Sequence, residues 1–103
     1  MNKYHAKPTF VEGRRFASRK EAARYSELRL LERAGKIQDL QTQVPFELIP
    51  KTRHGRAVRY VADFVYMQNG RKIVEDAKGV RTPVYKLKKR LMAEFLGVEI
   101  VEV

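Results

Sequence analysis

Asp63, Asp76 and Lys78 are the residues of this sequence whose types and spacing could do chemistry. Two carboxylates held close together form the oxygen-rich pair that a hard divalent cation such as Mg²⁺ prefers, with water and phosphate oxygens completing its octahedron. A lysine beside them adds positive charge where negative charge develops on a reacting phosphate. The three residue types therefore predict a metal-assisted hydrolytic site, provided that the fold brings them to one place.

The sequence around these residues predicts a β-hairpin. Segments 58–67 and 72–77 are rich in β-branched and aromatic residues, and the Asn-Gly dipeptide at 69–70 between them is the strongest short signal for a hairpin turn. Because a two-residue loop fixes the register of both strands, counting back from the turn sets Asp63 directly opposite Asp76. Like charges in opposed positions destabilise a hairpin, so something must offset their repulsion.

Alternation along the strands places Asp63, Asp76 and Lys78 on one face of the hairpin. The repulsion could be offset by a bound cation, or by a partly exposed ion pair between Lys78 and one aspartate. Apart from Glu75 the other face is apolar, and we expect it to pack as a single surface against a helix. Its remaining members are Tyr60, Ala62, Phe64, Tyr66, Ile73 and Ala77.

A first helix is predicted over residues 18–34, with Ser18 as its N-cap and Gly35 at its end. Glu21 follows Ser18 at the spacing of a capping box, in which the glutamate side chain bonds the Ser18 N–H. Glu21 also lies on the core-facing stripe of the helix, so it is alternatively a further ligand at the site. The other members of that stripe are Ala22, Tyr25, Leu28 and Leu31.

Three more elements follow from the remaining sequence. Residues 39–49 alternate as a strand, and Pro45 indicates an edge strand or a bulge. Residues 82–97 predict a second helix, with Thr82 as N-cap, Pro at its first position and Gly at its end. Residues 98–103 alternate with a period of two and predict a final strand. We expect the second helix to bury an apolar stripe formed by Val84, Leu87, Leu91 and Phe95.

These elements predict an α/β fold of the α+β type, with the order α-β-β-β-α-β in a single domain over residues 1–103. Residues 1–13 are expected to form an irregular N-terminal arm. The chain of 103 residues is 44% hydrophobic and 33% charged, which is typical of a globular domain rather than a disordered chain. It has no cysteine, which excludes disulfides and thiolate chemistry and favours a reducing, cytoplasmic location. No apolar run approaches the about 18 residues of a membrane helix, so we expect no membrane association.

The chain is strongly basic, because 22 lysines and arginines against 12 aspartates and glutamates give a formal net charge of +10. Segments 51–59 and 78–90 contain several basic residues and no acid. Such clusters are typical either of a solvated surface or of phosphate contacts, which make nucleic-acid binding salt-dependent. The candidate nucleic-acid-binding residues are Lys86, Lys89, Arg90, Arg53 and Arg56.

At this point the residues resemble the PD-(D/E)XK nuclease superfamily. The segments that carry the resemblance are Y-V-A-D-F-V-Y at 60–66, V-E-D-A-K-G at 74–79 and T-P-V-Y-K-L-K at 82–88. They are also similar to a phage- and prophage-associated family of small uncharacterised proteins assigned to that superfamily. The resemblance runs from Ser18 to the C-terminus and implies a restriction-endonuclease-like core, in which two helices flank a mixed central sheet. Ala62 departs from the proline of the motif, which is a common variation.

The resemblance implies roles for individual residues. Asp63 and Asp76 would be the acids of the motif and ligands of Mg²⁺, for which Mn²⁺ could substitute. The carbonyl of Ala77 would be a further metal ligand. Lys78 would orient or activate the attacking water, and Glu21 would be the metal-binding, catalytic acid that many members carry on the first helix.

Two further residues are candidates by the same resemblance. Gln43 matches a glutamine that some members carry near the site. Glu75 lies beside Asp76 and leaves an ambiguity about the second acid, although only Asp76 shares the expected face of Asp63.

As a function, the resemblance implies a Mg²⁺-dependent endonuclease that hydrolyses DNA phosphodiester bonds, directed by DNA structure and related to phage or recombination processes. A homodimer and phage recombination or packaging proteins are the expected partners. Two alternatives are a basic nucleic-acid-binding module without catalysis and an inactive nuclease-fold subunit of a larger complex. The opposed aspartates separate these readings, because an acid pair inside a positive surface would only weaken phosphate binding by a pure binding module.

Overall fold

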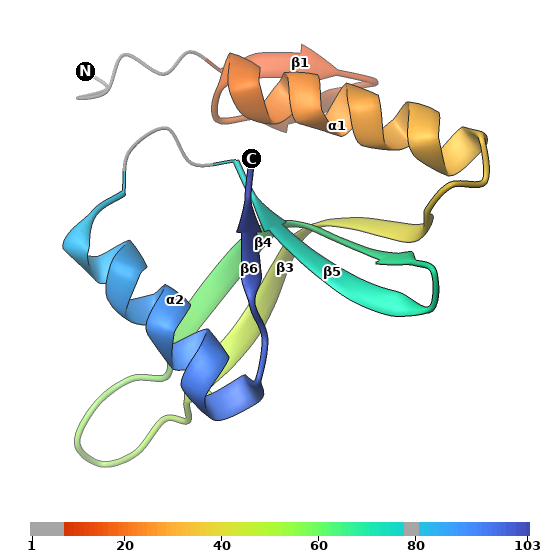
Figure 1. Ribbon diagram of the computed structural model, residues 1–103. Helices are drawn as coiled ribbons and strands as arrows, with labels where there is room; N and C mark the ends of the chain where they lie inside the picture. The colour runs from red at the N-terminus through yellow and green to blue at the C-terminus, as the bar shows by residue number, and fades with distance from the viewer. Residues whose placement is uncertain (1–7, 78–80) are drawn as a thin grey trace.

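The computed structural model describes residues 8–77 and 81–103, and it confirms an α+β fold in one small domain (Figure 1). The core elements follow one another in the expected order α-β-β-β-α-β, preceded by a short hairpin. In chain order they are β1 (Thr9–Val11), β2 (Arg14–Phe16), α1 (Arg19–Arg33), β3 (Gln38–Ile49), β4 (Val58–Gln68), β5 (Arg71–Asp76), α2 (Pro83–Leu96) and β6 (Ile100–Glu102).

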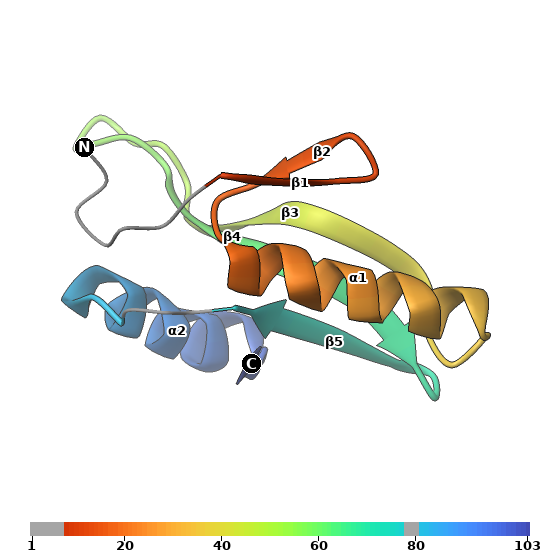
Figure 2. The same ribbon diagram turned by 90° about the horizontal axis from the view of Figure 1, so that it is seen from above.

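A four-stranded mixed sheet in the order β3-β4-β5-β6 forms the centre of the molecule. The first three strands pair antiparallel, whereas β6 lies parallel to β5 because α2 carries the chain back across the sheet. Pro45 lies in β3, which is an edge strand, as its missing N–H predicts. The two helices lie on opposite sides of the sheet (Figures 1 and 2).

Both helix boundaries confirm the capping residues expected from the sequence. The Ser18 hydroxyl accepts a hydrogen bond from the Glu21 N–H (3.1 Å). The Thr82 hydroxyl accepts one from the Tyr85 N–H (3.1 Å), and Gly97 ends α2 with a left-handed φ of 66°. These caps satisfy backbone groups that would otherwise have no partner at the helix ends.

The register of the β4–β5 hairpin is also as expected. Gln68 pairs with Arg71, and the ladder continues to Phe64 opposite Glu75. The turn residue Asn69 has a positive φ of 52°, as the first position of a type I′ hairpin turn requires. Asp63 and Asp76 therefore follow directly after the last pair of this ladder.

The expectation of an irregular arm over residues 1–13 is wrong for the described part of that segment. Residues Thr9–Val11 form β1, which pairs antiparallel with β2. Glu12 turns the chain with a positive φ, and Phe16 anchors the hairpin in the core at 4% exposure. Strands of three residues are too short for alternation to reveal them, so no usable pattern marks them in the sequence.

The expected orientation of α2 is wrong for three of the four residues of its apolar stripe, whereas the fourth, Leu91, is partly buried against the core as expected. Val84, Leu87 and Phe95 are 62%, 57% and 65% exposed, whereas Tyr85 and Met92 are 6% and 0% exposed. The helix instead packs against the sheet through a neighbouring stripe that includes Tyr85 and Met92. An apolar stripe therefore lies on the surface of α2.

The core consists of two hydrophobic clusters, one under each helix. Leu28 and Ile37 are central to the α1 cluster, and Met92 and Val74 are central to the α2 cluster. Tyr25, Tyr60, Tyr66 and Tyr85 are each buried in one cluster or the other.

The expectation of one apolar face along β4 is also wrong. Tyr60 and Ala62 belong to the α2 cluster, whereas Phe64 and Tyr66 belong to the α1 cluster. Residues two apart on a regular strand share a face. The alternation of β4 is therefore interrupted at Asp63, and the residues before and after it face different helices.

Strand β3 changes side at the same level, since Leu40 packs against the α1 cluster and Val44 against the α2 cluster. Gln43 lies at this crossing with a left-handed φ of 53°, an irregularity of the kind that re-aims side chains in strands. The pairs Thr42↔Phe64 and Val44↔Ala62 flank it and place it opposite Asp63.

No helix within residues 8–77 and 81–103 has the length and apolar character needed to cross a membrane.

Candidate functional site

Asp63 lies where β4 and β5 stop pairing as a ladder. Its Oδ2 accepts a hydrogen bond from the Ala77 N–H at 2.9 Å. The side chain thus binds the backbone directly after β5, where the pairing of β4 with β5 has ended. This contact holds the Asp63 carboxylate beside the residue that follows Asp76.

Asp76 is the last residue of β5 and is 1% exposed. The Tyr60 hydroxyl donates a hydrogen bond to its Oδ2 at 2.5 Å. Burial, and then the hydrogen bond to Asp76, raises the pKa of Tyr60 above its ordinary value, so the phenol remains a donor at neutral pH. Tyr60 therefore fixes one oxygen of the Asp76 carboxylate.

Glu21 and Gln43 reach the same place from α1 and β3. The side-chain amide of Gln43 is 3.4 Å from Glu21 Oε2 and 3.4 Å from Asp63 Oδ1. Glu21 is 5% exposed, and its backbone N–H binds Ser18 as in a capping box. Gln43 thus bridges the carboxylates of Glu21 and Asp63. The structure therefore places Glu21 and Gln43, both candidates by resemblance, beside Asp63.

Glu75 lies on the other side of β5 from Asp76. Arg24 on α1 binds both of its carboxylate oxygens, at 2.8 and 2.6 Å, and the Tyr66 hydroxyl donates a hydrogen bond to Oε2. This carboxylate is 1% exposed and is occupied by structural partners. Of the two adjacent acids, only Asp76 lies on the side of Tyr60 and the α2 cluster.

Lys78 lies outside the described residues. Ala77 is described and half-buried, and it contributes its N–H to Asp63. Within residues 8–77 and 81–103, no three His, Cys, Asp or Glu side chains form a group that could hold a metal ion. Mg²⁺ takes one or two protein carboxylates and fills its remaining positions with water and phosphate oxygens, a requirement that Asp63 and Asp76 could meet.

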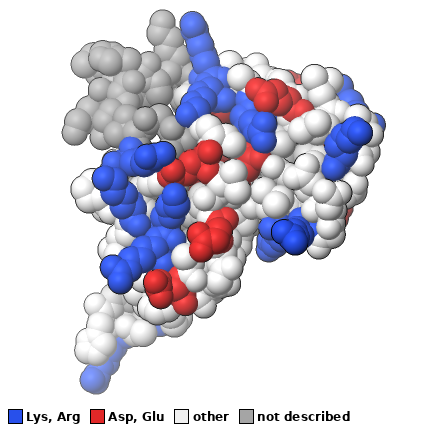
Figure 3. All heavy atoms as spheres, viewed as in Figure 1, with Lys and Arg blue, Asp and Glu red and all other residues white. Residues whose placement is uncertain are grey.

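The candidate nucleic-acid-binding residues occupy two separate surfaces. Lys86 and Arg90 are exposed on α2, and Arg53 and Arg56 are exposed in the loop between β3 and β4. Blue side chains accordingly gather over α2 on the left of Figure 3. In Figure 1 the loop projects beyond α2, away from α1.

Segment 78–90 contains no acid, but two of its basic residues, Arg81 and Lys89, have an acidic neighbour in the folded protein. Glu102 of β6 forms ion pairs with Arg81 at 2.7 Å and with Lys89 at 3.4 Å. The Tyr85 hydroxyl also donates a hydrogen bond to Glu102 at 2.7 Å. Lys89 is therefore partly neutralised, which the sequence did not reveal because Glu102 is remote along the chain.

Sequence reasoning missed the side chains that fix the two buried acids. The sequence predicts only a core position for Tyr60, yet its hydroxyl binds Asp76. Arg24 belongs to a helix face that carried no functional pattern, yet it binds Glu75. Alternation would have placed Tyr60 on the face opposite Asp63, so no local signal could have found its contact with Asp76.

The comparisons with known proteins add a family but no activity. A family model described as a protein of unknown function (DUF1064) matches residues 1–100. No curated protein and no solved structure matches the chain. Because the match covers nearly the whole sequence, the chain belongs to the DUF1064 family.

Proposed function

We propose that this protein is a Mg²⁺-dependent endonuclease of the PD-(D/E)XK type that hydrolyses DNA phosphodiester bonds. The observation that carries the proposal is that Gln43 on β3 contacts both Glu21 on α1 and Asp63 on β4, while Asp63 binds the backbone N–H of Ala77, the residue after Asp76 on β5. A chain that needed these acids only for solubility would not gather them at the crossing between its two core clusters.

The buried position of Asp76 argues against an incidental acid pair. Removing a carboxylate from water is costly unless it is hydrogen-bonded or binds a cation. Asp76 is 1% exposed, and the Tyr60 hydroxyl donates a hydrogen bond to its Oδ2. Its partly exposed neighbour Asp63 could share a cation with it on the solvent side.

The residues have distinct tasks in this proposal. Asp63 and Asp76 would hold Mg²⁺ or Mn²⁺, together with the Ala77 carbonyl, and Glu21 would contribute through water. When bound, such a cation polarises the scissile phosphate and lowers the pKa of a coordinated water. Gln43 would fix the rotamers of Glu21 and Asp63, and Lys78 would orient the attacking water.

The test is a cleavage assay on labelled duplex, nicked, flapped, forked and four-way DNA with Mg²⁺, Mn²⁺ or EDTA. We expect metal-dependent cutting that Asp63→Asn and Asp76→Asn each abolish. Asp39→Asn is the matched control, since it makes the same chemical change on β3 at a left-handed position that asparagine tolerates. DNA affinity in EDTA should stay equal or rise in the two site variants, because each removes a negative charge.

Loss of folding is monitored by thermal melting, and the partly exposed Asp63 keeps the test decisive if Asp76→Asn unfolds. Two results together would overturn the proposal: wild-type protein that cuts none of the DNAs, and a calorimetric titration that detects no divalent cation. DNA binding without cutting would then identify a basic nucleic-acid-binding module. Cutting only after partner proteins are added would identify a subunit of a larger complex.

A further inference from the structure

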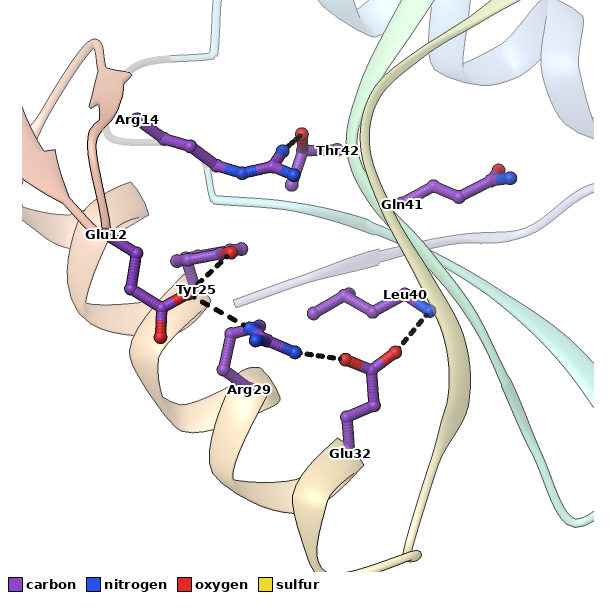
Figure 4. A pocket seen from close by; sticks show the side chains of 8 residues that line it. All are labelled: Glu12, Arg14, Tyr25, Arg29, Glu32, Leu40, Gln41 and Thr42. Carbon is purple, nitrogen blue, oxygen red and sulfur yellow. Dashed lines mark hydrogen bonds and ion pairs between the residues drawn. The ribbon is translucent and has the colours of Figure 1, made fainter.

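A hollow lies beside the candidate site, between the β1–β2 hairpin, α1 and β3 (Figure 4). Its volume is about 540 Å³. Its walls are mostly polar, with Arg14 and Glu12 from the hairpin, Arg29 and Glu32 from α1, and Gln41 and Thr42 from β3.

The two arginines of this pocket differ in their partners. Arg29 binds Glu12 at 3.1 Å and Glu32 at 2.6 Å, so its charge is neutralised by two carboxylates. Glu32 also accepts a hydrogen bond from the Leu40 N–H at 3.0 Å, which ties α1 to β3. This half of the pocket is a closed structural network.

Arg14 stands on the other half of the pocket. One Nη donates to the Thr42 hydroxyl at 2.9 Å, and the guanidinium lies 5.7 Å from the centre of the Tyr25 ring. Among residues 8–77 and 81–103 no carboxylate forms an ion pair with it. Its position is fixed by a hydroxyl and an aromatic face, which leaves its other N–H groups for an anion.

The position of Arg14 near the candidate site indicates which anion it would bind. Thr42, its partner, directly precedes Gln43, whose amide contacts Asp63 and Glu21. One residue of strand is about 3.3 Å long, so Arg14 lies close to the acids, on the α1 side of the sheet. A DNA strand with one phosphate at Asp63 would bring an adjacent phosphate toward Arg14.

We propose that this pocket binds a single-stranded nucleotide next to the cleaved bond and that Arg14 holds its phosphate. The inference rests on the proposed nuclease function and names its substrate class as DNA with an unpaired strand beside the cut. The hairpin, α1 and β3 enclose the pocket on three sides. A volume of about 540 Å³ is far smaller than one turn of a DNA duplex, so a double helix cannot enter the pocket.

The experiment measures DNA affinity by fluorescence anisotropy in EDTA, on a blunt duplex and on the same duplex with a single-stranded flap. Arg14→Gln should weaken binding of the flapped DNA about tenfold, because it removes a charged hydrogen bond to phosphate. Its effect on the blunt duplex should stay below about twofold. The slope of log affinity against log salt should fall by about 0.7 for the flapped DNA.

Arg15→Gln is the matched control. Arg15 is the next residue on β2, is also exposed, and points to the other side of the strand. It should weaken both DNAs equally and by less than Arg14→Gln does on the flapped DNA. Thr42→Val, which removes the hydroxyl that holds Arg14, should act in the same direction as Arg14→Gln.

Equal effects of Arg14→Gln and Arg15→Gln, or equal losses on both DNAs, would overturn the inference. Because the assay contains no metal, its outcome is separate from that of the cleavage assay. Cutting by the wild type with no special role of Arg14 would reject the pocket alone. Preference for the flap through Arg14 without any cutting would reject the nuclease alone, and binding of neither DNA would reject both.

Discussion

Adjacent acids at the end of β5 have different surroundings because the strand turns successive side chains to opposite sides. Glu75 points toward α1 and is held by Arg24 and Tyr66. Asp76 points toward the α2 cluster and accepts its hydrogen bond from Tyr60. The pair thus combines a structural acid with a candidate catalytic acid, and the two roles lead to different expectations for mutation.

Arg24→Met should lower the free energy of unfolding by about 3 kcal/mol, because it leaves the Glu75 carboxylate buried without its cation. Urea denaturation measures the change. Glu27→Gln is the control, since it removes the exposed partner of the same arginine and should change stability by less than about 0.5 kcal/mol. Equal effects of both variants would mean that Glu75 is solvated in solution.

Glu102 should make stability depend on pH. The hydrogen bond from Tyr85, and then that from Lys89, holds the pKa of Glu102 below its ordinary value of 4.5. A pKa lowered on folding contributes stability that is complete above the ordinary value and is lost as pH falls through the folded value.

The difference in free energy of unfolding between wild type and Glu102→Gln should therefore shrink as the pH falls from about 7 to about 3. Glu99→Gln, which removes an exposed negative charge just before β6, is the comparison for the loss of one charge. A difference for Glu102→Gln that does not vary with pH would contradict the ion pairs of β6.

At the scale of elements, local signals predicted most of the fold. The Asn-Gly turn fixed the register of β4 and β5, and Ser18, Thr82 and Gly97 fixed the helix ends. The change of side along β4 could not be predicted in this way, because it depends on which helix covers each half of the ribbon. The same is true of the rotation of α2, since long-range packing chose the stripe with Met92 over the more apolar one.

The orientation of α2 is testable by paired truncations. Met92→Ala should cost about 2 to 5 kcal/mol, because Met92 is fully buried. Leu87→Ala should cost less than about 0.5 kcal/mol, because Leu87 is 57% exposed. Thermal or urea unfolding separates the two values. The reverse order would restore the orientation expected from the sequence.

The irregular position in β3 should separate stability from activity. Gln43 has a φ of 53°, which costs a non-glycine residue about 1 kcal/mol or more. Gln43→Gly should therefore leave stability unchanged or raise it, while cleavage falls because the bridge between Glu21 and Asp63 is lost.

Gln41→Gly is the control for this change, two residues away in the same strand. It should lower stability by about 0.5 to 1 kcal/mol, as glycine does inside a strand. Full cleavage by Gln43→Gly would show that the amide does not position the acids.

At the scale of the molecule, the two clusters and the projecting loop make a flat body of 45 × 40 × 20 Å. Its radius of gyration of 14.8 Å exceeds the about 13 Å expected for a compact chain of this length. The candidate acids lie where the β3–β4 ribbon passes between the clusters. The pocket of Arg14 lies on the α1 side, and the exposed Lys86 and Arg90 of α2 lie on the other, so DNA that used both would cross the acids between them.

The last prediction concerns which cations of α2 take part in such binding. Lys86→Gln should weaken duplex binding and lower the slope of log affinity against log salt by about 0.9, because an exposed lysine releases one counterion. Lys89→Gln should lower the slope by less, because Glu102 already neutralises Lys89. Both variants remove one charge from the same helix, so net charge alone predicts equal effects. If Lys89→Gln lowers the slope as much as Lys86→Gln, the pair with Glu102 opens on DNA, and the β6 side of α2 faces the phosphate backbone.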